Sequence, residues 1–162
     1  MSDDKIESAL EQLNYGVSVV TVGRGGVENG LTVSWLCQVS FTPPMVMIAV
    51  DSKHYSIEFL ESTKNFTVNV LREGQGAIAG HFAKPSMTDR DKLDDLATRE
   101  APSGAAILSD ALAYLDCDVI SSVVAGDHTL FIGQVLDAGV LNAGAPMTTS
   151  SGMRYRKAKS SS

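Results

Sequence analysis

The stretch NGLTVSWLCQVSFTPP, Asn29 to Pro44, carries the clearest structural signal in this chain, because polar and apolar residues alternate along it and none is charged. The apolar residues hold the odd positions: Leu31, Val33, Trp35, Val39 and Phe41, with Cys37 among them. A period of two predicts a β-strand with one face in a core. The even positions carry Thr32, Ser34, Gln38 and Ser40. A strand face in water usually carries Lys, Glu or Arg, so this face suits a polar ligand or a partner surface better than solvent.

The length and composition of the chain predict a single domain over residues 1–162. Hydrophobic residues make up 44% of the chain and charged residues 20%, which is ordinary for a globular protein and unlike a disordered one. A chain of this length buries a sizeable core without disulfides or a structural metal. We expect the last residues, 157–162, to form a flexible tail.

The charge of the chain disfavours nucleic acid as a partner. The net charge is −6, and the 13 Lys and Arg residues are scattered until a short basic run at residues 154–159. Phosphate contacts need a clustered basic surface. We therefore interpret the terminal run as a solvated tail.

Neither a membrane span nor a secretion signal is predicted. The uncharged stretch 29–50 is long enough to cross a bilayer, but Pro43-Pro44 interrupts it and its first half alternates, so we interpret it as two strands. The acidic N-terminus has no apolar core of signal-peptide length. Cys37 and Cys117 show no metal-ligand spacing and suit a reducing compartment. We expect a cytoplasmic protein without a metal site.

Strands outnumber helices in the rest of the chain. Strands are predicted at residues 17–22, 45–51, 65–71, 112–124 and 128–141, and helices at 4–15, 52–63 and 74–82. We expect the first helix to pack against the strands, the last two strands to form a hairpin at Gly126-Asp127, and residues 84–104 to form a loop with one helical turn near 89–96. The fold class is mainly β: a closed or nearly closed antiparallel barrel with helices outside.

Several segments taken together resemble a known family. They are the opening stretch, SKHYSIEFL at 52–60, FTVNVL at 66–71, LSDALAYLDC at 108–117 and GDHTLFIGQV at 126–135. This combination closely resembles the flavin reductase-like family, from about Tyr15 to the GMRYRK end. It is most similar to the reductase domains in the C-terminal part of cyanobacterial flavodiiron proteins. The resemblance implies an FMN-binding split β-barrel, Greek-key-like, with short peripheral helices, that pairs into homodimers.

The resemblance also implies that the opening stretch lines the flavin. The residues implicated are Asn29, Thr32, Ser34, Trp35, Leu36, Cys37 and Ser40. Their hydroxyls and the nearby backbone N–H groups would reach the phosphate, the ribityl chain and the ring edge. A flavin has an apolar ring with a hydrogen-bonding rim, so it needs neutral donors at short reach. The alternative is that this face is a dimer contact, and both can hold.

The segment SKHYS lies where the family supplies phosphate ligands. Lys53 offers a cation, while Ser52 or Ser56 can present a hydroxyl beside the N–H groups of a helix start. The alternative is an ordinary N-cap with a surface lysine.

Two histidines are implicated by the resemblance. In relatives the histidine of GDHT lies at the flavin face and is associated with nicotinamide binding or hydride transfer, so His128 is the candidate catalytic residue. His81, in GHF, is a candidate residue beside the ring. Asp127 is interpreted as a turn residue. The alternative for His128 is a structural role at a strand start.

The C-terminus departs from the family pattern. Relatives carry Pro-Leu, aromatic residues and then G-x-Y-R, whereas this chain has Met147, a polar run at 148–151 and two residues between Gly152 and Tyr155. The contact of this segment with flavin or nicotinamide is therefore open.

The function implied is an NAD(P)H-dependent flavin oxidoreductase. Hydride would pass from NADH or NADPH to FMN, and the electrons to an acceptor such as a monooxygenase. One alternative is an FMN-holding electron carrier with little nicotinamide activity, and another is a barrel that binds a different ligand such as haem.

Overall fold

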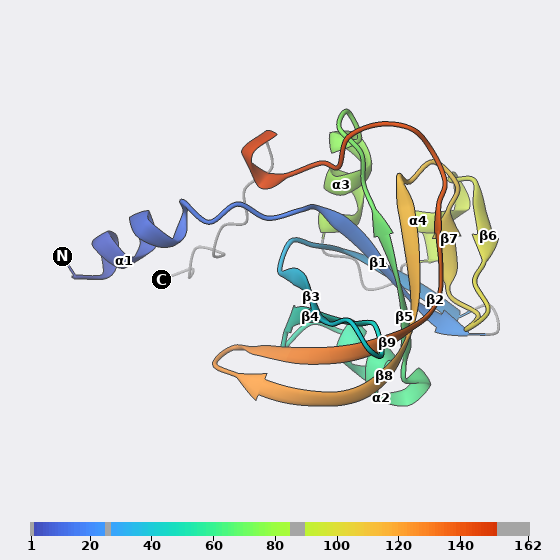
Figure 1. The fold of residues 1–162 in the computed structure, drawn as a ribbon, viewed down its shortest axis with the longest axis horizontal. Coiled ribbons are helices and arrows are strands. Elements are labelled where there is room, and N and C mark those ends of the chain that lie inside the picture. Colours follow the sequence, from blue (N-terminus) through green and yellow to red (C-terminus); the bar gives the residue numbers. More distant parts are fainter. Residues whose placement is uncertain (1, 25–26, 85–89, 152–162) are drawn as a thin grey trace.

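The structure is a computed structural model that describes residues 2–24, 27–84 and 90–151. Within these ranges, seven strands form one antiparallel sheet in the order β2-β1-β5-β8-β9-β4-β3, and two short strands form a second sheet, β6-β7 (Figure 1). The strands are β1 (Ser18–Arg24), β2 (Val27–Val33), β3 (Leu36–Ser40), β4 (Met45–Asp51), β5 (Asn65–Val70), β6 (Thr98–Glu100), β7 (Ala106–Leu108), β8 (Ala113–Ala125) and β9 (His128–Val140). The helices are α1 (Ser2–Leu10), α2 (Ser56–Thr63), α3 (Gly76–Ala83), α4 (Arg90–Asp94) and a 3-10 turn at Thr149–Ser151. The segment from Gly152 to Tyr155 and the predicted 157–162 tail lie outside the described residues.

One apolar core lies inside the curled seven-stranded sheet. It receives side chains from β1, β2, β4, β5, β8 and β9, and Leu60 of α2 closes it. Phe66 and Phe131 are its largest residues and are almost fully buried. The ring of Phe66 occupies the space that a side chain at position 133 would need, which accounts for Gly133. The prediction of a mainly β fold with an antiparallel barrel and short outer helices is confirmed.

The predicted hairpin of the last two strands is also confirmed, and β1 and β2 form another antiparallel pair. Strands β1 and β2 pair from Ser18–Val33 to Arg24–Val27. Strands β8 and β9 pair over their whole length around Gly126, whose φ of +61° lies in the left-handed region that glycine tolerates best. This long hairpin brings residue 128 to the end of β4.

A second core lies against the outside of β1, beneath α3, α4 and β7. Polar side chains hold β7 there: Asn69 Nδ2 donates to the carbonyl of Val19 at 3.1 Å, and Asn69 Oδ1 accepts from the N–H of Leu108 at 2.8 Å. The helical turn near 89–96 is confirmed by α4, but β6 and the ordered pairing of β6 with β7 were not predicted. The sequence of β6, TRE, has no apolar alternation, because all three of its residues are exposed.

The N-terminal helix differs from its prediction in two ways. It ends at Leu10 rather than near Tyr15, and it does not pack against the barrel. Figure 1 shows it extending away from the strands. Its apolar residues Ile6 and Leu10 are 59% and 57% exposed, and Leu13 beyond it is 52% exposed. The apolar spacing was identified correctly, but no surface of this chain covers it within the described residues.

The opening stretch also differs from its prediction, because it forms two strands with a break between them. Leu31 and Val33 on β2 are buried as expected. Ser34 and Trp35 lie outside any strand, and the alternation changes phase there. On β3 the inward residue is therefore Leu36, which pairs with the buried Ile48.

The odd positions that follow the break consequently face outward. Cys37 is exposed, and Val39 and Phe41 are 47% and 89% exposed. The prediction that these three residues enter the core is wrong: the phase change at Ser34-Trp35 turns Cys37 outward, Val39 is the extra residue of a bulge between Gln38 and Ser40, and Phe41 lies in the turn beyond β3.

No helix in the described ranges is both long enough and apolar enough to cross a bilayer.

Candidate functional site

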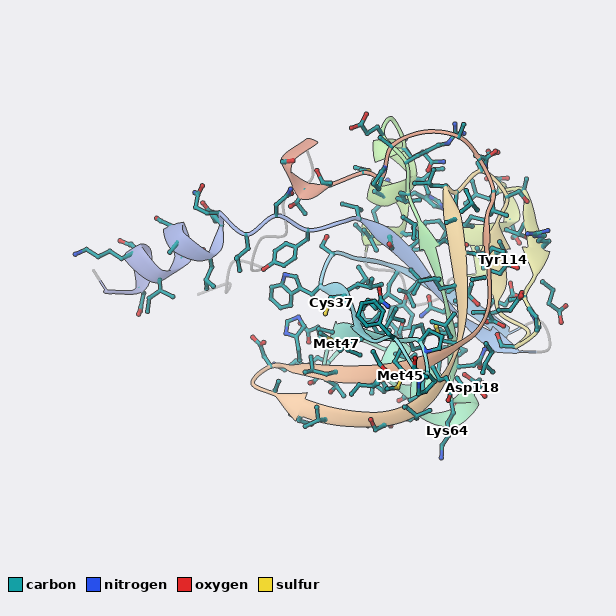
Figure 2. The ribbon with its side chains drawn as sticks, in the orientation of Figure 1. Cys37, Met45, Met47, Lys64, Tyr114 and Asp118 are labelled. Atoms are coloured by element: carbon teal, nitrogen blue, oxygen red, sulfur yellow. The ribbon has the colours of Figure 1, made fainter. Side chains whose placement is uncertain are left out.

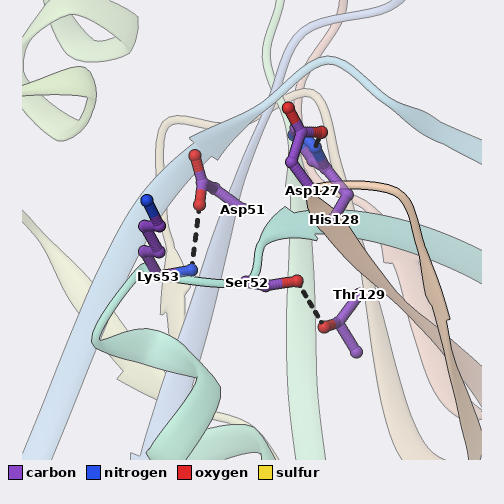
Figure 3. Close-up of polar contacts among 6 residues, drawn as sticks. All are labelled: Asp51, Ser52, Lys53, Asp127, His128 and Thr129. Carbon is purple, nitrogen blue, oxygen red and sulfur yellow. Dashed lines mark hydrogen bonds and ion pairs between the residues drawn. The ribbon is translucent and has the colours of Figure 1, made fainter.

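The predicted catalytic histidine lies where β4 ends and β9 begins. His128 pairs with Asp51 in the β4–β9 register. The chain after β4 is tied to the hairpin, since the N–H of Ser52 donates to the carbonyl of Asp127 at 3.0 Å. The hydroxyls of Ser52 and Thr129 are 2.9 Å apart. Figure 3 shows these residues gathered at the tips of the two strands.

The His128 ring is nearly enclosed. Its side chain is 10% exposed, and its Nδ1 lies 2.7 Å from Oδ1 of Asp127, whose side chain is 82% exposed. The Trp35 ring lies 4.6 Å from the His128 ring, centroid to centroid, with 43° between their planes. The Tyr15 ring follows at 6.5 Å from Trp35. The two-residue break between β2 and β3 therefore places an aromatic side chain over the histidine.

Tyr15 is held next to Trp35 by the C-terminal part of the chain. Its N–H donates to Oγ1 of Thr149 at 3.0 Å, and the N–H of Thr149 donates to the carbonyl of Tyr15 at 2.8 Å. Tyr15, Asp127 and Thr129 were not predicted as site residues. The contacts of Tyr15 join distant parts of the chain, so local sequence carried no signal for them, whereas Asp127 is the immediate neighbour of His128 in GDHT.

Lys53 and Ser52 lie beside this group, in the turn that precedes α2. Both are exposed, and the N–H of Lys53 donates to Oδ1 of Asp51 at 2.9 Å. Figure 3 shows Lys53 and Asp51 next to each other and the histidine close by. An accessible ammonium and a hydroxyl at such a turn are suitable ligands for a phosphate group.

Asn29, Ser56 and Thr32 are occupied by contacts within the protein. Asn29 is buried, and its Nδ2 donates to Oγ of Ser56 at 2.6 Å. Its Oδ1 accepts from the N–H of Gly30 and from the hydroxyl of Tyr55. The hydroxyl of Thr32 donates to the carbonyl of Ala79 at 2.6 Å. The structure thus gives these three side chains structural contacts, and their predicted flavin contacts stay a prediction.

The start of α2 is similarly engaged. The N–H of Ser56 donates to Nδ1 of His54 at 3.1 Å, and the N–H of Ile57 donates to the carbonyl of the same residue. Ser56 is fully buried. Of the three predicted phosphate ligands, Ser52 and Lys53 are the ones that reach the surface.

The remaining predicted residues divide into two groups. Ser34 is buried beside Trp35, Leu36 packs on the core, and Cys37 and Ser40 lie on β3. His81 lies on α3 instead, where its Nε2 is 2.9 Å from the carbonyl of Lys92 and its ring meets Phe82 edge-on. The structure does not bring His81 into contact with the His128 group.

A sheet surface with an uncharged centre leads up to the site. Residues of β4 alternate, with Val46, Ile48 and Val50 inside the barrel and the residues between them outside. Cross-strand partners share a face, so the register places one set of residues together on the outside. This set, which we call the outer face, is Cys37, Met45, Met47, Ala49, Asp51, Asp118, Ser121, Val123, Leu130, Ile132 and Gln134; its two carboxylates lie at opposite ends, Asp51 opposite His128 and Asp118 opposite Gln134, and its centre is uncharged. Cys37, Met47 and Met45 follow one another along this side of the barrel in Figure 2.

His128 stands at the end of the outer face, because it lies two residues before Leu130 on β9. The site thus combines an aromatic pair, a largely apolar sheet surface and an exposed lysine. A flavin mononucleotide has an aromatic ring with a polar rim and a phosphate group, so this donor set fits it. Trp35, Ser52 and Lys53 would hold it, with His128 at the edge of the ring. No cluster of three His, Cys, Asp or Glu residues able to bind a metal occurs in the described ranges.

Comparisons with known proteins agree with this description. The family profile described as flavin reductase like domain matches residues 10–158. The chain therefore belongs to the flavin reductase-like family, and the family predicted from the sequence is confirmed.

Two curated relatives are informative. The chain is 40% identical over 139 residues to the putative diflavin flavoprotein A 6 of Nostoc, covering 85% of this chain and 24% of that protein. It is 35% identical over 123 residues to the reductase component of 4-nitrophenol 4-monooxygenase/4-nitrocatechol 2-monooxygenase of Rhodococcus opacus, covering 76% of this chain and 64% of that one. The chain spans about a quarter of the length of the diflavin flavoproteins that it matches.

A solved structure has the same fold. The NADH:FAD oxidoreductase SgcE6 of Streptomyces globisporus is 33% identical and superposes with a TM-score of 0.83, over 96% of this chain and 93% of that one. The split-barrel expectation is thereby confirmed.

Proposed function

We propose that this chain is an NAD(P)H-dependent flavin reductase that binds FMN beside Trp35 and His128 and passes the electrons to an acceptor. The observation that carries the proposal is the Trp35–His128 aromatic pair, 4.6 Å apart between ring centroids, at the end of a sheet face whose centre is uncharged. Membership of the flavin reductase-like family supports it. The family and the pair together favour a reductase over the haem-binding alternative.

The residues of the chain align two ring systems. A bound flavin supplies the hydride acceptor when a reduced nicotinamide lies against it. Trp35 and the outer face exclude water from one side of that arrangement, and His128 stands at the edge where the rings meet. Lys53 and Ser52 hold the phosphate end. No side chain needs to act as a nucleophile, because alignment and local electrostatics supply the acceleration.

The flavin is FMN in our proposal, with FAD as the competing ligand. The solved relative is named as an NADH:FAD oxidoreductase, so binding must be tested with both FMN and FAD. Since Lys53 lies outside the enclosed part of the site, an adenosine extension beyond the phosphate would project toward solvent.

The electron acceptor in our proposal is an oxygenase. One relative is named as the reductase component of a two-component monooxygenase. This supports a small reductase that serves a separate protein. Both cysteines are free thiols, which suits the reducing cytoplasm where NADH and NADPH are present.

We further propose that two copies pair through the outer face. Val123, at the centre of this face, is 54% exposed, and the two charged residues of the outer face, Asp51 and Asp118, lie at its ends. Contiguous uncharged surfaces of this kind mark protein interfaces. A dimer through this face would also enclose the mouth of the site at His128.

An anaerobic absorption titration tests the activity. The purified protein receives FMN, or in a parallel sample FAD, and then NADH or NADPH. Bleaching of the flavin band much faster than for free flavin would establish the reductase and identify its donor. A bound flavin that neither nucleotide bleaches would reject the reductase and favour the electron carrier. A protein that binds neither flavin would reject both.

A further inference from the structure

The carboxylate of Asp127 has a specific contact that its place in a turn does not require. Its Oδ1 lies 2.7 Å from Nδ1 of His128, although 82% of the Asp127 side chain is exposed. A turn residue at the surface could point its side chain into solvent. This side chain instead meets a ring that is itself only 10% exposed.

The backbone fixes Asp127 independently of the histidine. Its carbonyl accepts the N–H of Ser52 at 3.0 Å, and Gly126 supplies the left-handed φ of the two-residue turn. The carboxylate therefore starts from a fixed main chain. The second restraint on the His128 ring is the ring of Trp35, with 4.6 Å between the two centroids. His128 is thus held by two neighbours of different kinds, one through its face and one through Nδ1.

The chemistry of the contact determines where the proton resides. An ionised carboxylate has no hydrogen to donate and can only accept a hydrogen bond. Nδ1 of His128 must then carry the hydrogen. In a neutral imidazole the other nitrogen, Nε2, holds the lone pair and is the acceptor.

We propose that Asp127 is a positioning residue that holds His128 in the Nδ1–H tautomer, so that Nε2 is the acceptor at the site. This inference rests on the proposed function, because the orientation matters when a nicotinamide substrate approaches the histidine. The carboxamide of that substrate carries an NH2 group, which is a donor suited to Nε2. Asp127 acts through His128 and does not itself touch the reacting atoms.

Nitrogen NMR of the histidine side chains tests the tautomer without any activity assay. The chain has three histidines, so His54→Gln and His81→Gln variants assign the signals of His128. At about pH 8.5, where histidine side chains are generally neutral, we expect Nδ1 of His128 to show a directly bonded hydrogen and Nε2 to show none. An Nε2–H signal in the wild-type protein would overturn the proposal.

Two matched substitutions separate the contact from the charge. Asp127→Asn keeps a residue that suits turns but offers both a donor and an acceptor to Nδ1, so we expect a mixture of tautomers. Asp51→Asn removes the same charge from the residue opposite His128 in the β4–β9 pair, and we expect the wild-type tautomer to persist. An unchanged tautomer in Asp127→Asn, or an equal change in both variants, would contradict a role for the contact.

Steady-state kinetics extend the test to the reaction. We expect Asp127→Asn to bind FMN as the wild type does and to lose about tenfold in kcat, the lower end of what losing a histidine's hydrogen-bond partner costs at metal centres. An unchanged kcat in a variant with mixed tautomers would reject the positioning role. A wild-type protein that fails to oxidise either nucleotide would reject the proposed function, while the NMR comparison would still decide the tautomer.

Discussion

Trp35 lies 4.6 Å from His128 although 93 positions separate them in the sequence (128 − 35 = 93), and the two rings are tilted by 43°. The contact exists because the chain leaves its strand at Ser34-Trp35, between β2 and β3. In an unbroken strand, the alternation of side chains would have decided on which face Trp35 lies. The break therefore creates the aromatic wall of the site.

Replacing Trp35 with alanine is expected to weaken FMN binding by about tenfold, because loss of an aromatic stacking partner removes about 1 kcal/mol or more. Trp35→Phe retains a ring and should lose much less. Since Trp35 is the single tryptophan of the chain, binding to the wild type can be followed by quenching of its fluorescence, and binding to both variants by flavin fluorescence. Equal affinity of the alanine variant would place the flavin elsewhere.

Replacing His128 with alanine is expected to separate binding from turnover. The His128 side chain is 10% exposed, so it offers little surface to the flavin but stands at the mouth of the site. We expect FMN affinity within about twofold of the wild type and NADH oxidation slowed by roughly 100-fold, the lower end of a positioned acid–base group. Stopped-flow flavin reduction measures the rate. An unchanged rate with normal FMN binding would assign His128 a structural role.

Substitution of Lys53 is expected to distinguish FMN from riboflavin, which lacks the phosphate. An exposed ammonium contact with a phosphate contributes modestly, so Lys53→Gln should weaken FMN binding about three- to tenfold and leave riboflavin unchanged. Lys64→Gln, at the opposite end of α2, is the matched control. Calorimetric titration with both ligands gives the comparison. Equal losses for the two ligands would show that Lys53 does not contact the phosphate.

The sequence predicted the positions of the strands better than it predicted which strand residues face the core and which face outward. The buried strand at Met45–Asp51 and the β8–β9 hairpin were anticipated, because their patterns are continuous. The outward positions of Cys37 and Val39 were not, because the break at Ser34-Trp35 and the bulge at Val39 change the alternation without a local signal in composition. In the site, the motif led to His128, while the inward turn of the Asn29 amide depends on Ser56 and Tyr55 from another segment.

Introducing a charge on the outer face is expected to disrupt pairing of two copies. Val123 is 54% exposed and lies opposite Leu130, so Val123→Glu would place a carboxylate in the middle of an uncharged surface. We expect the wild type to sediment as a dimer and this variant as a folded monomer. Val140→Glu, at the other end of β9 and 83% exposed, should remain dimeric. A wild type that is monomeric at all concentrations would contradict the proposed interface.

The two cysteines are expected to differ sharply in reactivity. Burial, with smaller contributions from Asp116 and Asp118, raises the pKa of the Cys117 thiol to about 12, so it stays protonated and enclosed at ordinary pH. Cys37 is exposed on β3, two residues after Trp35. We therefore expect only Cys37 to react with an alkylating reagent in the native protein at about pH 8, since the thiolate is the reactive form, and to react faster in the monomeric Val123→Glu variant than in the wild-type dimer, where the outer face is covered.

The same reaction reports on the site. Saturating FMN should slow modification of Cys37 severalfold if the flavin lies against the outer face beside it, and mass spectrometry of peptides identifies the modified residue. Cys37→Ser should abolish the fast reaction, and unfolding in denaturant should expose both thiols of the wild type. Rapid modification of Cys117 in the native state would show that the barrel opens. An unchanged rate at Cys37 under saturating FMN would move the flavin away from the β3 side of Trp35.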